Sequence, residues 1–123
     1  MIVGIGVDLT PIDRMGKAMS NHPERLEARL FTDGERAYCR KMAEPMQHFA
    51  ARFAAKEAIL KALSVPEGLS WHELEVVSED GGAPRIVLRG RAAEAAQAAG
   101  VRKLHLSLTH AGGQAMAFVV AEG

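Results

Sequence analysis

The stretch FAARFAAKEAILKAL, residues 49–63, decides how the rest of the chain is organised. It holds six Ala together with Leu, Lys and Glu, and it contains neither Gly nor Pro, so it predicts a strong helix. Small alanines line one side, and the opposite side carries an apolar stripe made of Phe49, Phe53, Ile59, Leu60 and Leu63. Glu57 and Lys61 lie one turn apart. Taken alone, the helix favours a simple i,i+4 ion pair worth about 0.2–0.5 kcal/mol over a functional site.

Residues 2–9, IVGIGVDL, predict the first strand. Alternation places Gly4, Gly6 and Asp8 on one face. The other face carries Val3, Ile5, Val7 and Leu9. Two interpretations of the Gly-lined face stay open: a ligand approaches closely there, or a helix packs tightly on the strand and Asp8 is an ordinary polar residue at its end.

Capping and turn signals mark the other elements. Helices are predicted to start at Thr10-Pro11 and at Glu44-Pro45. The segment from Pro23 to Leu30 has a helical pattern, and the capping box of Thr32–Glu35 opens a further helix to Met42. The remaining predicted segments are strands over 71–78 and 85–88 joined by a hairpin turn at 79–82, a helix over 91–99, and strands over 104–109 and 115–121. Counted by main elements, the order β-α-α-α-β-β-α-β-β predicts one compact α/β (α+β) domain.

Composition narrows the class of protein. A chain of 123 residues is near the commonest domain size, so we expect a single domain over residues 1–123. The net charge is zero and the pI about 7.0, which predicts no bulk attraction to nucleic acid or membranes. We expect no signal segment and no membrane span. Cys39, the only cysteine, excludes an intrachain disulfide and fits a reducing, cytoplasmic setting.

Charge is unevenly spread between Arg14 and Lys41. This segment holds seven basic residues against four acidic ones. Ordinary solvated helix faces account for such an excess, and a binding surface for an acidic partner is the alternative.

Several kinds of catalytic site are disfavoured. Cys39 is expected on an exposed amphipathic helix, no Ser lies in a Gly-x-Ser-x-Gly turn, and the five His lack zinc-ligand spacing. What remains is Asp8, at the end of the Gly-lined strand, with Glu57 and Lys61 on the long helix; Arg52 lies about 140° around that helix from Glu57. Two carboxylates suit Mg²⁺, and a Lys supplies a charge for phosphate. The residues alone indicate Mg²⁺–phosphate chemistry as one option and nothing finer.

Four ordered blocks carry a resemblance to a known family. GIGVDL (4–9), FTDGE (31–35), RFAAKEAILKAL (52–63) and SLTHAGGQAMA (107–117) together resemble the holo-[acyl-carrier-protein] synthases, small 4′-phosphopantetheinyl transferases of bacterial fatty-acid biosynthesis. The resemblance implies their fold, in which a long central helix packs on a mainly antiparallel sheet.

The resemblance also implies roles for individual residues. Asp8 and Glu57 would hold Mg²⁺, which also binds the pyrophosphate of coenzyme A, and Lys61 would neutralise phosphate charge. Glu57 would help deprotonate a serine hydroxyl of the acyl carrier protein, and adenosine 3′,5′-bisphosphate would leave. Positions that match coenzyme-contacting motifs are Arg52, Lys61, Ser107, Thr109 and His110. For His110, a strand-end histidine that caps backbone groups is the alternative.

The resemblance further implies a homotrimer with active sites between protomers. Acyl carrier proteins are strongly acidic, so the basic residues of the N-terminal helices become candidate partner contacts. These are Arg14, Lys17, Arg25 and Arg29, with Arg14 preferred.

One departure from the family is the loop over residues 64–68, which is shorter and has one Gly, so its coenzyme contacts are left open. Two rival functions also stay open: a Mg²⁺-dependent phosphohydrolase that acts on a nucleotide, and a non-enzymatic trimeric module that binds coenzyme A.

Overall fold

The computed structural model describes residues 1–65, 68–78 and 82–123. The elements are β1 (Ile2–Pro11), α1 (Ile12–Asn21), α2 (Arg25–Leu30), α3 (Asp33–Arg40), α4 (Pro45–Leu63), the 3-10 helix η1 (Trp71–Glu73), β2 (Leu74–Val77), β3 (Arg85–Leu88), α5 (Gly90–Ala98), β4 (Lys103–Ala111) and β5 (Gln114–Glu122). The predicted α+β class is confirmed. The helix predicted after Pro23 forms, so among the described residues the helices α1 to α4 lie between β1 and β2, one more than the order β-α-α-α-β-β-α-β-β counts. The predicted strand over 71–78 begins with η1 instead, and the predicted turn at 79–82 falls largely outside the described residues.

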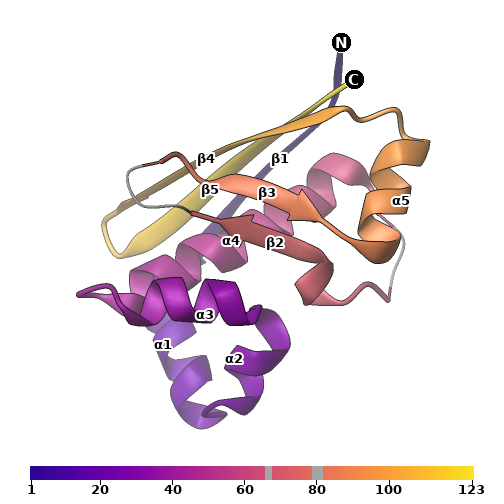
Figure 1. Ribbon diagram of the computed structural model, residues 1–123. Coiled ribbons are helices and arrows are strands. Elements are labelled where there is room, and N and C mark those ends of the chain that lie inside the picture. Colours follow the sequence, from indigo (N-terminus) through magenta and orange to yellow (C-terminus); the bar gives the residue numbers. More distant parts are fainter. Residues whose placement is uncertain (66–67, 79–81) are drawn as a thin grey trace.

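Two antiparallel sheets lie on either side of the long helix. The larger sheet has the strand order β1-β5-β4, and the smaller one is the pair β2-β3. Figure 1 shows α4 running between them, with α1, α2 and α3 gathered at one end of the molecule and the two chain termini side by side at the other. None of the helices in the described ranges is both long and apolar enough to cross a membrane.

The two strand glycines explain how β1 lies on α4. A Cβ added to Gly4 would stand 1.9 Å from the carbonyl oxygen of Ala62, and one added to Gly6 would stand 1.8 Å from that of Ala58. Both distances are far below any real contact, so only glycine lets the strand approach the helix backbone this closely. Tight packing of a helix on the Gly-lined face is therefore confirmed, and the role of Asp8 at the end of that face stays a prediction.

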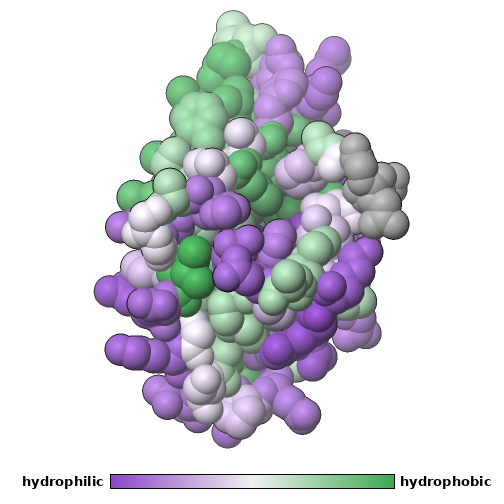
Figure 2. All heavy atoms as spheres, turned by 90° about the vertical axis from the view of Figure 1, so that its left-hand side faces the viewer, coloured by the Kyte–Doolittle hydropathy of each residue, from purple (hydrophilic) through white to green (hydrophobic). Residues whose placement is uncertain are grey.

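The opposite face of β1 is apolar and exposed. We call this surface, with its β5 neighbour, the outer face; it consists of Val3, Ile5, Val7, Leu9 and Phe118. Ile5 is 57% exposed and Phe118 is 42% exposed. Five large apolar side chains gathered on one sheet face are typical of a surface that another molecule covers. Figure 2, a view from the side of the β4–β5 turn, likewise shows hydrophilic groups over the helical end and more hydrophobic groups toward the upper left.

The core is built around α4, which is buried on most of its circumference. Its C-terminal half belongs to a core cluster with β2 and β5, and its N-terminal half belongs to a second cluster with the N-terminal helices. The prediction that Cys39 lies on an exposed helix face is wrong, because the thiol is fully buried within the cluster that includes Phe31 and Phe49. Burial raises the pKa of Cys39 to about 12, so it is not a nucleophile at neutral pH.

Candidate active site

Asp8 and Lys61 meet where β1 passes α4. Asp8 follows Gly6 on the strand face that packs on the helix. Lys61 lies on α4 in the turn between Ala58 and Ala62, the residues that Gly6 and Gly4 approach. The Lys61 ammonium donates to the main-chain oxygen of Val7 at 2.9 Å and lies 3.2 Å from an Asp8 carboxylate oxygen. The close approach that the glycines permit therefore also brings these two charged groups together.

Glu57 is half-buried on the same side of α4. Burial is the largest cause that raises its pKa; the negative charge of Asp8 raises it further, and Lys61 opposes the shift. The structure thus places two carboxylates within electrostatic reach of each other beside one ammonium group.

These residues fit a magnesium ion. Two carboxylates that repel each other are stabilised when a divalent cation binds between them. A purely structural ion pair would need only one of the two carboxylates. Among the described residues there is no group of three or more His, Cys, Asp or Glu side chains that could hold a metal ion. Mg²⁺ commonly needs only one or two protein carboxylates, because substrate phosphates and water complete its shell.

A separate cavity of about 370 Å³ gathers the other predicted coenzyme residues. Arg52, Ser107, Thr109 and His110 all line it, although they come from α4 and β4. Tyr38 and His48, which the sequence did not single out, line it too. His110 lines the cavity as well, and the choice between a coenzyme contact and a capping histidine stays a prediction.

Arg52 is held rigidly in the wall of this cavity. Its guanidinium donates to the Ser78 hydroxyl at 2.6 Å and to the His48 carbonyl at 3.4 Å, and it lies 4.2 Å from the centre of the Tyr38 ring. Only 2% of the residue is exposed, and its Nε has no partner in the described part of the chain. The guanidinium therefore adds a fixed positive charge to the cavity wall, which suits a ligand oxyanion.

The cavity is electropositive. Burial is the main cause that lowers the pKa of His48, the guanidinium of Arg52 lowers it further, and the charge of Glu44 opposes the shift. An anionic ligand would relieve this repulsion.

Within one chain the carboxylate pair and the cavity do not form a single pocket. Neither carboxylate lines the cavity, in keeping with the angle of about 140° between Arg52 and Glu57 around α4.

The predicted partner contacts all lie at the surface. Arg14 and Lys17 are exposed on α1, and Arg25 and Arg29 are exposed on α2. Their roles stay predictions, as do those of the site residues above.

Comparison with known proteins settles the family. The family model of the 4'-phosphopantetheinyl transferase superfamily matches residues 4–119. The chain belongs to this family. Among curated relatives, a holo-[acyl-carrier-protein] synthase from Anaeromyxobacter dehalogenans (strain 2CP-1) is 48% identical over 126 residues, covering 100% of this chain and 98% of the relative. One from Frankia alni is 49% identical over 121 residues and covers 98% of each chain.

Solved transferase structures of the family share the fold. The holo-[acyl-carrier-protein] synthase from Neisseria meningitidis matches with a TM-score of 0.90 and 26% identity, covering 100% of both chains. That from Helicobacter pylori, solved in complex with coenzyme A, matches with a TM-score of 0.82 and 29% identity, covering 96% of this chain and 99% of the other. The resemblance stated from the four sequence blocks is confirmed.

Proposed function

We propose that the chain transfers the 4′-phosphopantetheine group of coenzyme A to a serine hydroxyl of an apo-acyl carrier protein, with Mg²⁺ as cofactor. The product adenosine 3′,5′-bisphosphate leaves, and the activated carrier serves cytoplasmic fatty-acid synthesis. The observation that supports this most directly is the contact of Asp8 with Lys61 where β1 packs on α4, with Glu57 within electrostatic reach of both.

The residues suggest how the reaction proceeds. Asp8 and Glu57 would hold Mg²⁺, which when bound neutralises charge on the diphosphate of the coenzyme. Glu57 would also help to remove the proton of the attacking serine hydroxyl. The serine oxygen forms a bond to the phosphorus that bears pantetheine, and the bond from that phosphorus to the leaving bisphosphate breaks. Lys61, half-exposed and adjacent, stabilises the charge that develops on the phosphate oxygens.

The cavity around Arg52 suits the adenosine end of the coenzyme. Its volume of about 370 Å³ accommodates a nucleoside-sized group, and the guanidinium of Arg52 in its wall supplies positive charge for a phosphate. Ser107, Thr109 and His110 supply further polar contacts on the β4 side.

A homotrimer would bring the carboxylate pair of one protomer close to the coenzyme cavity of a neighbouring protomer. Strand register places Val7, Phe118 and Ser107 in one cross-strand row. The next row is Leu9, Met116 and Thr109. The apolar outer face is therefore continuous with the polar β4 residues of the coenzyme cavity, and a copy of the chain that covered it would reach those residues.

The carrier protein would dock on the N-terminal helices. Arg14, Lys17 and Arg25 present exposed positive charge there, which complements an acidic partner and speeds its encounter.

One assay separates the proposal from its rivals. Enzyme, coenzyme A, Mg²⁺ and an apo-acyl carrier protein are incubated, and the carrier is weighed by mass spectrometry. A gain of one phosphopantetheine mass supports the transferase. Phosphate release without carrier protein would instead identify a phosphohydrolase, and coenzyme binding with an unchanged carrier would identify a binding module. Asp8→Ala and Glu57→Ala should each abolish the mass gain while the protein stays folded.

A further inference from the structure

A buried ion pair lies one residue away from Glu57. The side chains of Lys56 and Glu35 are both 0% exposed, and the ammonium nitrogen lies 2.8 Å from a carboxylate oxygen of Glu35. The pair is remote from solvent on the side of α4 that faces β2 and α3, so it contacts neither the carboxylate pair nor the coenzyme cavity.

Every hydrogen-bonding position of the Lys56 ammonium is used. Besides the bond to Glu35, it donates to the carbonyl oxygen of Trp71 at 2.9 Å and to that of Leu74 at 2.8 Å. An ammonium has three protons, so the geometry at this nitrogen is complete.

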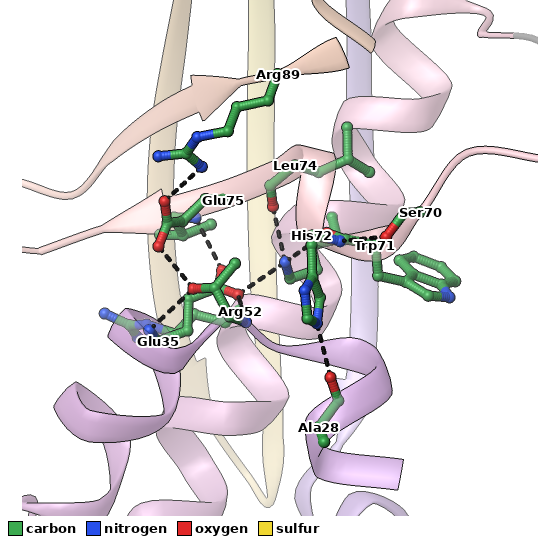
Figure 3. A network of polar contacts seen from close by, with 12 residues as sticks. Ala28, Glu35, Arg52, Ser70, Trp71, His72, Leu74, Glu75 and Arg89 are labelled. Atoms are coloured by element: carbon green, nitrogen blue, oxygen red, sulfur yellow. Dashed lines mark hydrogen bonds and ion pairs between the residues drawn. The ribbon is translucent and has the colours of Figure 1, made fainter. Parts of the chain in front are cut away.

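Glu35 is equally saturated. One carboxylate oxygen accepts from the main-chain N–H of Thr32 at 2.9 Å, and the other accepts from that of Val76 at 2.8 Å. The pair thus binds main-chain groups at the start of α3, in η1 and in β2 at once. Figure 3 shows Glu35 beneath the strands, with Trp71 and Leu74 beside it and contacts that continue through Glu75 to Arg89 at the surface.

Stability alone does not explain such a pair. Removing two charges from water costs several kcal/mol each, and apolar residues of similar volume often stabilise a protein as well or better. What apolar residues cannot do is bind specific main-chain carbonyl and amide groups and so fix one orientation of a helix.

The pair and the glycines hold α4 from nearly opposite sides. Lys56 and Ala58 lie about 160° apart around the helix, and Glu57 projects between them. A rotation of α4 by ~10° would move a group ~6 Å from the axis by ~1 Å. A misplacement of about 1 Å in an active site costs on the order of 10²-fold in rate.

We propose that Lys56 and Glu35 are positioning residues, which fix the rotation of α4 so that Glu57 and Lys61 stay in register with Asp8 on β1. This inference rests on the proposed transferase function. It assigns the pair no contact with substrate or metal.

The test compares three enzymes in the carrier-modification assay. Lys56→Met/Glu35→Leu removes both charges and keeps the volume close to that of the native pair. Arg89→Met is the matched control, because Arg89 is an exposed cation at the far end of the same network, 2.6 Å from Glu75. Folding is checked by circular dichroism and thermal unfolding, and kcat and the KM for coenzyme A are measured separately over a range of Mg²⁺ concentrations.

The double variant should fold and lose about 10²-fold in kcat, keep its KM for coenzyme A within about twofold, and need more Mg²⁺ for half its maximal rate. Arg89→Met should match the wild type in all three. A folded double variant with wild-type kcat and Mg²⁺ dependence would overturn the proposal.

A milder double variant, Lys56→Met/Glu35→Gln, guards against failure to fold. If neither double variant folds, the pair is a requirement of the whole fold and the positioning proposal is overturned as well. Failure of the proposed function would look different, since the wild type itself would then leave the carrier mass unchanged.

Discussion

Replacing Gly6 with alanine is the sharpest test of how the fold builds the site. The added Cβ would stand 1.8 Å from the Ala58 carbonyl oxygen, 2.7 Å from its carbonyl carbon and 3.1 Å from the Ala62 nitrogen. All three are backbone atoms of a buried helix, which cannot rotate out of the way as a side chain can. To restore an ordinary contact of ~3.4 Å, β1 must therefore move away from α4 by roughly 1.6 Å.

Two measurable losses follow from that shift. Overpacking of this kind costs about 1–3 kcal/mol of stability. Asp8 is two residues beyond Gly6 on the same strand face, so its carboxylate moves away from Glu57 and Lys61 by a comparable distance, and we expect at least ~10²-fold loss of transfer rate.

The assay pairs thermal unfolding with carrier-modification kinetics, and Gly16→Ala is the stability control. Gly16 lies inside α1, and a Cβ there would meet only a Met46 side-chain carbon at 3.7 Å. That substitution should raise stability by about 0.5–1 kcal/mol, since alanine is the better helix former. A Gly6→Ala protein with the wild-type unfolding temperature and kcat would refute the account of the β1–α4 crossing.

Four further outcomes are expected. The pKa of Glu57 is raised in the folded state, so its contribution to stability is full below its unfolded pKa and is lost as the pH rises through the folded pKa. In calorimetry without metal, Glu57→Gln should therefore unfold at a higher temperature than the wild type at about pH 8. At about pH 4 the two proteins should unfold at similar temperatures. Millimolar Mg²⁺ should raise the unfolding temperature of the wild type but not of Asp8→Asn, and an equal rise in both would remove Asp8 from the metal site. In surface plasmon resonance, Arg14→Glu should weaken binding of the acyl carrier protein about tenfold, because it reverses a charge that faces an acidic partner. The affinity for coenzyme A should stay unchanged. Equal loss of both affinities would mean that Arg14 does not act in carrier binding. Phe118→Glu should turn the proposed homotrimer into monomers in light scattering, because it places a charge at the centre of the outer face, and a trimer that persisted would show that another surface holds the assembly.

The sequence predicted the parts of the fold that local chemistry determines. The capping box at Thr32 forms as expected, with reciprocal bonds between Thr32 and Glu35, and Pro45 begins the long helix. The strand alternation around Gly4 and Gly6 was also readable. Whether the Gly-lined face receives a ligand or a helix was not, because the answer depends on a helix more than fifty residues away.

The site was predictable only in part, for a related reason. Asp8 and Glu57 stand out as carboxylates in apolar surroundings, and the four family blocks assign them a role. Tyr38 and His48 carry no local signal, since only the tertiary packing brings them to the cavity wall beside Arg52. Cys39 was misplaced because a short helix with charges on one side has the pattern of a surface element, whereas its other face is closed by α4.

The position of Lys56 in its helix already indicates that this lysine is buried and paired. Around the helix axis it falls in the middle of the apolar stripe, within about 40° of Leu60 on one side and about 20° of Leu63 on the other. A lysine at the centre of such a stripe must be paired or must interrupt the core, because a buried unpaired ammonium is too costly. Glu35 lies at the third position of a capping box, and that role alone accounts for a glutamate there. The sequence therefore gives no sign that Glu35 also pairs with Lys56. Buried polar positions of this kind are found by asking which charged residues contradict the periodicity of their own helix.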